Sequence, residues 1–373
     1  MTLYLDHAAT SPLRPEAREA FLRACEIGAN ASSVHGPGRK AKVLLEDARA
    51  TILRALEGED TGRLVFTSGG TEANALALRQ AEAYDYIVVS EGEHDSIHTG
   101  AQAIGKPIVT LPLTRNGDAD VEALRRILSE HPGRAFVCVM AVNNETGVVS
   151  NVGRVVYEHN GWLHVDAVQA LGKLGLHFDG MDADSVSLSA HKIGGPQGTG
   201  ALIYHSRHSL RPMTIGGGQE LGLRAGTENV PGIAAFAAAL EACSSGDEAV
   251  QAAQADVESA LKAQGVEIIG ESARRAPGLL CLAQPHWTSQ LQLIHMDMNG
   301  IAVSSGSACS SGKVKASRVV AAMGRADLAD KVLRVSAGWT TTPGDWQRFL
   351  AIWSKGYETY LARHAGARAK EQA

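Results

Sequence analysis

Short apolar runs alternate with helix-like segments over the first 243 residues of this chain, and this alternation constrains the fold more than any other feature. The pattern predicts strands at residues 64–67, 86–89, 107–111, 135–141, 162–165, 184–188 and 200–204. It predicts helices at residues 14–26, 38–57, from 71 onward, 121–130 and 230–243. Continuous apolar strands separated by helices are typical of a mostly parallel sheet with helices on both faces. The fold class is therefore α/β.

A chain of 373 residues is too long for one simple hydrophobic core. After the helix at 230–243, the segment "SSGDEA" reads as a hinge, and the remainder resembles a smaller α+β unit. We therefore expect a large domain at residues 15–246. The small domain would combine residues 1–14 and 247–373.

Charge and cysteine content exclude several classes of protein. A formal net charge of −5 and a pI near 6.3 argue against sequence-independent nucleic-acid binding. The five cysteines form no Cys-x-x-Cys pair, which indicates a reducing compartment and no structural zinc site. Neither a signal peptide nor an apolar run long enough for a membrane span is recognisable, so we expect a cytoplasmic protein.

In open α/β sheets, ligands bind beyond the carboxyl ends of the strands, and four such places carry suggestive residues. The first is "TSGGTEAN" (67–74), a glycine turn whose free backbone N–H groups could bind a phosphate. The alternative is an ordinary helix cap by Ser68 or Thr71. No Walker lysine and no G-x-G-x-x-G follow, which disfavours a nucleoside triphosphate or a dinucleotide.

Two further places hold an acid and an imidazole. In "HVDAVQ" (164–169), Asp166 and Gln169 follow an apolar strand, and they would face the same way if a helical turn begins there. The carboxylate could equally cap the next helix. In "EGEHDS" (91–96), His94 could stack on a planar ring, although a polar loop histidine is the plainer interpretation.

The fourth place, "SVSLSAHKIGGPQGTGAL" (185–202), puts Ser189, His191 and Lys192 between a strand and a glycine-rich loop. An isolated His-Lys pair is usually exposed surface. A lysine in a glycine-lined cleft can instead be desolvated, lose its proton and condense with a carbonyl group.

Taken together, these places offer phosphate donors, an amine, a carboxylate and a stacking ring. Pyridoxal 5′-phosphate requires that set, because its phosphate needs donors, its aldehyde an amine and its pyridine nitrogen an anion. One more feature is "SSGSACSSGK" (304–313), which sets Cys309 among small polar residues, where a thiol is accessible. The alternative is an incidental loop thiol.

Ten segments in order resemble the cysteine desulfurases of the class V aminotransferase family. They are "YLDHAATSP" (4–12), "SSVHGPGR" (32–39), "TSGGTEANALAL" (67–78), "EH" (93–94), "VNNETGVV" (142–149), "HVDAVQALGK" (164–173), "SAHKIGGPQGTGAL" (189–202), "GGGQELGLRAGTENV" (216–230), "GIAVSSGSACSSG" (300–312) and "LRVSAGWTTT" (333–342). The resemblance implies the type I fold of pyridoxal-phosphate enzymes, with a large cofactor-binding domain and a small domain that carries the cysteine loop.

The resemblance also implies roles at matching positions. Lys192 would hold the cofactor and move protons at the substrate's α-carbon, and His94 would stack on the ring and could shuttle protons. Asp166 would pair with the pyridinium nitrogen and Gln169 with the ring hydroxyl. The residues that would hold the phosphate are Gly70, Thr71, Ser189 and His191. No metal is implied.

Further implications concern the substrate and partners. Asn144 and Arg334 would bind the carboxylate of L-cysteine, and Cys309 would take its sulfur as a persulfide and leave L-alanine. Thr227 would complete the phosphate site of a second subunit, which implies a homodimer. A sulfur-acceptor protein, in iron–sulfur cluster assembly or another thiolation, would then receive the sulfur.

Some positions depart from the family's usual residues, and they are Ala29, Ala31, Gly194, Gln197 and Arg318. None belongs to the group expected to touch the cofactor. The four other cysteines lie in helical or apolar stretches and are interpreted as packing residues. The alternatives are a selenocysteine lyase or another class V aminotransferase, most of which would not need Cys309. A regulator would need a DNA-binding module, and a non-enzymatic scaffold would be expected to lose Lys192 or Asp166.

Overall fold

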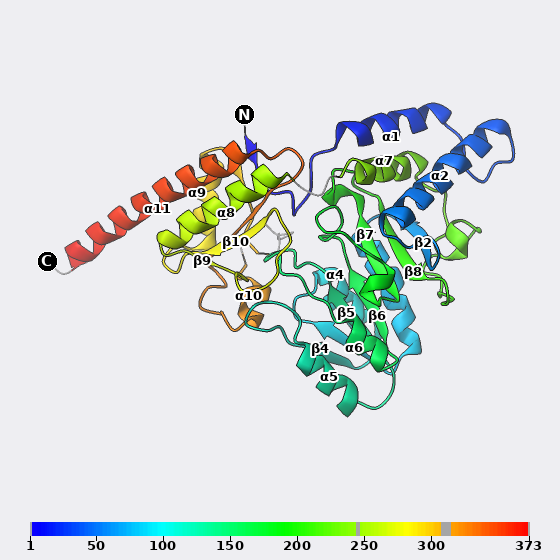
Figure 1. The fold of residues 1–373 in the computed structure, drawn as a ribbon, viewed down its shortest axis with the longest axis horizontal. Coiled ribbons are helices and arrows are strands. Elements are labelled where there is room, and N and C mark those ends of the chain that lie inside the picture. Colours follow the sequence, from blue (N-terminus) through cyan, green and yellow to red (C-terminus); the bar gives the residue numbers. More distant parts are fainter. Residues whose placement is uncertain (1, 244–246, 307–314, 372–373) are drawn as a thin grey trace.

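The computed structural model describes residues 2–243, 247–306 and 315–371 (Figure 1). Its largest sheet has seven strands in the order β2-β8-β7-β6-β5-β3-β4, all parallel except β8, which runs antiparallel to both neighbours. The strands are β2 (Gly62–Thr67), β3 (Tyr86–Ser90), β4 (Ile108–Leu111), β5 (Ala135–Met140), β6 (Trp162–Asp166), β7 (Ser185–Ser189) and β8 (Gly200–His205). The expected α/β class and the mostly parallel sheet are confirmed.

Both faces of this sheet are buried, which explains why its strands are apolar at nearly every position. Side chains of a strand alternate between faces, so Val137 packs in one apolar cluster and its neighbour Phe136 in another. One face carries α2 (Gly36–Ala55), α5 (Val121–Glu130), α6 (Gly153–Glu158) and α7 (Val230–Glu241), with α1 (Pro15–Ile27) packed on α7. The other face carries α3 (Gly70–Leu78) and α4 (Asp95–Ile104).

A separate apolar cluster, outside the large sheet, joins the start of the chain to its last third. Its antiparallel sheet has the order β12-β10-β9, and a short parallel pair joins β1 to β11. Leu3 and Leu5 pack there with Leu280, Trp346 and Trp353. The elements are β1 (Leu3–Tyr4), α8 (Glu248–Ala263), β9 (Glu267–Ile268), β10 (Leu279–Ala283), α9 (Ser289–Met298), β11 (Ile301–Ala302), α10 (Arg318–Ala322), β12 (Val332–Ser336) and α11 (Pro343–Glu371). The domain limits given above stay a prediction.

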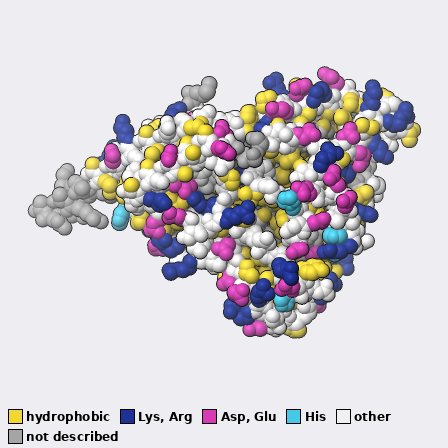
Figure 2. Space-filling model, viewed as in Figure 1, with side chains coloured by type: hydrophobic (Ala, Val, Ile, Leu, Met, Phe, Trp, Pro, Cys, Tyr) yellow, Lys and Arg dark blue, Asp and Glu magenta, His cyan; other side chains and the backbone are white. Residues whose placement is uncertain are grey.

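Short 3₁₀ turns complete the fold at Arg79–Ala83, Asp179–Met181, Ala190–Lys192 and Glu220–Gly222. Within the described ranges, no helix combines the length and the apolar character needed to cross a membrane. On the face shown in Figure 2, acidic and basic side chains are interspersed. That face therefore offers no broad surface of a single charge to a polyanion.

Candidate active site

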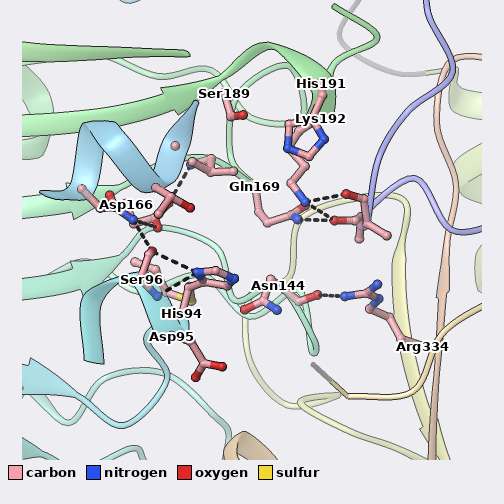
Figure 3. A pocket seen from close by; sticks show the side chains of 17 residues that line it. His94, Asp95, Ser96, Asn144, Asp166, Gln169, Ser189, His191, Lys192 and Arg334 are labelled. Carbon is pink, nitrogen blue, oxygen red and sulfur yellow. Dashed lines mark hydrogen bonds between the residues drawn. The ribbon is translucent and has the colours of Figure 1, made fainter. Parts of the chain in front are cut away.

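A cavity of about 320 Å³ lies where the carboxyl ends of β6 and β7 meet the first turns of α3 and α4 (Figure 3). The N-terminal segment at Ala8 and Ala9 and the side chain of Arg334 on β12 also line it. Ten residues singled out in the sequence line this cavity together, and they are Gly70, Thr71, His94, Asn144, Asp166, Gln169, Ser189, His191, Lys192 and Arg334.

Lys192 ends the 3₁₀ turn that follows β7, and its side chain enters the cavity. Its ammonium group donates to the backbone oxygens of Ala8, at 2.7 Å, and Ala9, at 2.8 Å. Burial, reinforced by the positive charges of Arg334 and Lys173, lowers the pKa of Lys192 from 10.5 to about 8. A much larger share of this amine is therefore neutral, and nucleophilic, close to neutral pH than in an exposed lysine.

Asp166 ends β6 and is buried. Its Oδ2 accepts from the amide of Asn74 at 2.8 Å, and its Oδ1 accepts from the backbone N–H of Val168 at 3.0 Å. The carboxylate thus does cap the following turn, and it also faces the cavity. Beside it, the Gln169 amide donates to the Ala8 oxygen at 2.7 Å.

No side chain of the described residues caps the N-terminus of α3, so the backbone N–H groups of its first turn donate to no capping group. Gly69 is the N-cap residue, with φ +154°, and neither Ser68 nor Thr71 caps the helix, so the capping alternative is wrong. The hydroxyl of Ser189 is buried without a hydrogen-bond partner at this end of the cavity. A Cβ on Gly70 would lie 2.7 Å from Val168 Cγ2, so only glycine permits this approach. Free donors in a cradle of this kind suit a phosphate.

Two contacts hold Arg334, and its Nε–H has no partner among the described residues. Its guanidinium donates to the Asn144 backbone oxygen and to the Asp6 carboxylate, both at 2.9 Å. Its Nε is buried without a partner, and the side chain is only 3% exposed. The two contacts fix the orientation of the fork, and the unpaired Nε–H is available to an anion.

His94 is the N-cap residue of α4 and lies at the exposed side of the cavity. Its Nδ1 faces both the backbone N–H and the hydroxyl of Ser96, at 3.1 and 2.9 Å. In Figure 3 the opposite edge of the ring is turned toward the cavity.

A family model described as aminotransferase class-V matches residues 3–349. The chain belongs to the class V aminotransferases. It is 36% identical to a cysteine desulfurase of Cereibacter sphaeroides and 36% identical to an IscS-like cysteine desulfurase of Mycobacterium tuberculosis, with 94% of each chain covered in both comparisons. A solved NifS-like protein from Rickettsia africae superposes with a TM-score of 0.88 at 32% identity, covering 96% of this chain and 100% of that one.

Three contacts of this class V aminotransferase were not anticipated from its sequence. Asp6 holds Arg334, Asn74 holds Asp166, and Ser96 contacts His94. Asn74 could have been found, because it lies four residues after Gly70 and so shares a helix face with it. Asp6 gave no comparable signal beyond its place in "YLDHAATSP", since its partner is 328 positions away.

Two of the expected residues are not among those that line the cavity in the described part of the chain. Thr227 is exposed, in the loop before α7, and does not line the cavity. Cys309 lies outside the described residues. Among the remaining cysteines, Cys138 and Cys281 are buried, whereas Cys25 is exposed on α1. The packing interpretation of Cys25 is therefore wrong, because none of the described segments of the chain covers this side chain.

Proposed function

We propose that this class V aminotransferase is a cysteine desulfurase that uses pyridoxal 5′-phosphate. The observation that carries the proposal is Lys192, an amine with its pKa lowered to about 8, in one cavity with a buried carboxylate and a fixed arginine. The named relatives, which match almost the whole chain, support the same activity.

The residues present fit the cofactor. The uncapped start of α3 and the unpartnered hydroxyl of Ser189 would hold the phosphate, Asp166 the pyridine nitrogen, and Lys192 the aldehyde carbon. When bound, the cofactor supplies an electron sink for the charge that develops at the substrate's α-carbon.

The substrate would be oriented by its carboxylate. Arg334 offers an unpaired Nε–H in a guanidinium that Asp6 and Asn144 already hold in place, so little further ordering is needed. With the carboxylate held there, Lys192 is the group in the cavity whose lowered pKa suits it to receive the α-proton near neutral pH.

Cys309 would accept the sulfur, an assignment that rests on the sequence and the relatives. The thiolate forms an S–S bond as the Cβ–S bond of cysteine breaks, and a proton replaces the sulfur on Cβ. Cysteine and the thiol thereby become alanine and a persulfide, with no outside oxidant or reductant. An acceptor protein would then take the sulfur. We propose a homodimer in which Thr227 of each subunit completes the partner's phosphate site.

The test measures alanine and sulfide formed from L-cysteine with excess thiol reductant. We expect Cys309→Ala to abolish activity, while Cys25→Ala, which removes an exposed cysteine far from the cavity, keeps it. Lys192→Ala should abolish activity, while Lys355→Ala, at an exposed position of α11, should not.

Two outcomes would overturn parts of the proposal. Full activity in Cys309→Ala would exclude the persulfide route through this residue. Alanine release from selenocysteine but not from cysteine would make the protein a selenocysteine lyase.

A further inference from the structure

A continuous chain of hydrogen bonds runs beneath the cavity from the buried Trp162 to His94. Trp162 Nε1 lies 3.1 Å from Ser185 Oγ, which lies 2.9 Å from His164 Nδ1. His164 Nε2 lies 3.1 Å from Asn74 Oδ1. The Asn74 amide nitrogen contacts Asp166 Oδ2 at 2.8 Å and Ser96 Oγ at 2.9 Å.

At one end of this chain of hydrogen bonds the indole N–H can only donate. Ser185 Oγ therefore accepts from Trp162, which leaves its own hydrogen able to bond to His164 Nδ1. Burial lowers the pKa of His164 to about 3, so the ring is neutral and carries its hydrogen on Nε2. That hydrogen is donated to Asn74 Oδ1, and a longer contact of 3.4 Å to Ser187 Oγ is compatible with the same direction.

The other end gives the same answer independently. An ionised Asp166 only accepts, so the atom of Asn74 that faces it must be the amide nitrogen. The amide oxygen of Asn74 is then turned to His164, which must present an N–H. Both ends agree on the orientation of an amide that would otherwise be ambiguous.

The direction continues through Ser96 to His94. The second hydrogen of the Asn74 amide goes to Ser96 Oγ, so the serine hydroxyl has its own hydrogen free for His94 Nδ1 at 2.9 Å. The backbone N–H of Ser96 points at the same nitrogen from 3.1 Å. Nδ1 thus faces two donors, and a hydrogen on it would meet both.

We propose that Asn74 and Ser96 are positioning residues that fix His94 as its Nε2–H tautomer, a hydrogen-bond donor toward the cavity. A neutral ring of this form has its basic nitrogen turned away from the cavity. His94 then supports the cofactor ring and donates a hydrogen bond, and it does not take the α-proton. This inference deepens the proposed function and rests on it, because it leaves Lys192 as the base.

The test is ¹⁵N NMR of the protein as purified, labelled at histidine, at mildly alkaline pH where histidine rings are neutral. His94→Gln identifies the signals of His94 by difference. We expect Nδ1 of His94 in the unprotonated range and Nε2 in the protonated range, as a single tautomer. In Ser96→Ala the Nδ1 signal should move toward the protonated range, because one of its two donors is gone. Ser129→Ala, beside the half-buried His159, is the matched control and should leave His94 unchanged.

The hydrogen bonds that run from Trp162 to Asn74 are tested separately, through the NMR signals of His164. We expect His164 to show Nε2–H in the wild type and also in Ser185→Ala, because the Asn74 amide oxygen still requires an N–H on this nitrogen. A protonated Nδ1 on neutral His94 in the wild type would overturn the proposal, and so would an unchanged Nδ1 signal in Ser96→Ala. None of these signals needs turnover, so an enzyme inactive on cysteine that still shows one tautomer would refute the proposed function alone.

Discussion

The ammonium group of Lys173 donates to Gln169 twice, to its backbone oxygen at 3.0 Å and to its side-chain oxygen at 3.2 Å. The second contact turns the Gln169 amide so that its nitrogen faces the Ala8 oxygen. Ala8 also accepts from Lys192, so the two lysines are linked through one backbone carbonyl and one amide. Burial lowers the pKa of Lys173 to about 8 as well.

Replacing Lys173 with methionine should raise the pKa of Lys192, because the charge of Lys173 is one of the causes that lower it. Absorbance can follow the rate at which added pyridoxal phosphate attaches to the protein at a series of pH values. In the variant, this rate should reach half of its maximum, the midpoint, at a higher pH. Lys173→Arg keeps the charge and should keep the midpoint. Identical midpoints for methionine and wild type would show that the two lysines do not interact.

Replacing Ser189 with alanine should have opposite effects on folding and on cofactor binding. Its buried hydroxyl has no partner, so its removal should leave the cofactor-free protein as stable as before or more stable by ~1 kcal/mol. Cofactor affinity should fall, because a phosphate donor is lost. Urea unfolding and an absorbance titration measure the two quantities. As a control, Ser185→Ala removes a partnered hydroxyl and should destabilise by ~1–3 kcal/mol. A Ser189 variant that is destabilised to that extent would contradict the prediction.

Removing Glu220 should be among the most damaging substitutions far from the cavity. This carboxylate is 2% exposed, pairs with both ends of the Arg49 fork at 2.9 and 3.1 Å, and accepts from the Phe66 backbone N–H at 2.7 Å. Glu220→Ala should lower the free energy of unfolding by ~3 kcal/mol, since it leaves the Phe66 N–H without an acceptor and the Arg49 guanidinium with only the exposed Glu46 as an ion-pair partner among the described residues. Replacing the exposed Glu19, which pairs with Arg23, with alanine should lower the free energy of unfolding by under ~1 kcal/mol. Urea midpoints for the two variants, if equal, would refute this ranking.

The fold should lose stability in mild acid through its buried histidines. Burial lowers the pKa of His7 and His191 from 6.5 to about 4 and that of His164 to about 3. As the pH falls, the unfolded chain therefore takes up these protons before the folded protein does. The stability that this difference affects is fully present above about pH 6.5 and falls as the pH drops toward 4. The slope of the free energy of unfolding against pH should be smaller in His164→Phe, by up to ~1.4 kcal/mol per pH unit. An unchanged slope would mean that His164 is protonated in the folded state.

Much of the cavity could be predicted because strand ends are visible in the sequence. Asp166, Ser189 and Lys192 each follow an apolar run, and parallel strands bring their carboxyl ends to one edge of a sheet. Hydrogen bonds made within one turn were harder to predict. Whether Ser68 or Gly69 caps α3 depends on backbone angles, and these are set by the packing of Gly70 against Val168.

The sequence by itself determined the α/β class, the strands and most of the residues that line the cavity, because burial on both faces of a sheet requires continuous apolar runs. Only the tertiary structure decided which groups those residues meet. Lys192 meets the backbone oxygens of Ala8 and Ala9, and Arg334 meets Asp6. These contacts join the start of the chain to its middle and to its last third, and they depend on how segments far apart in the sequence pack together, which no local pattern of residues encodes.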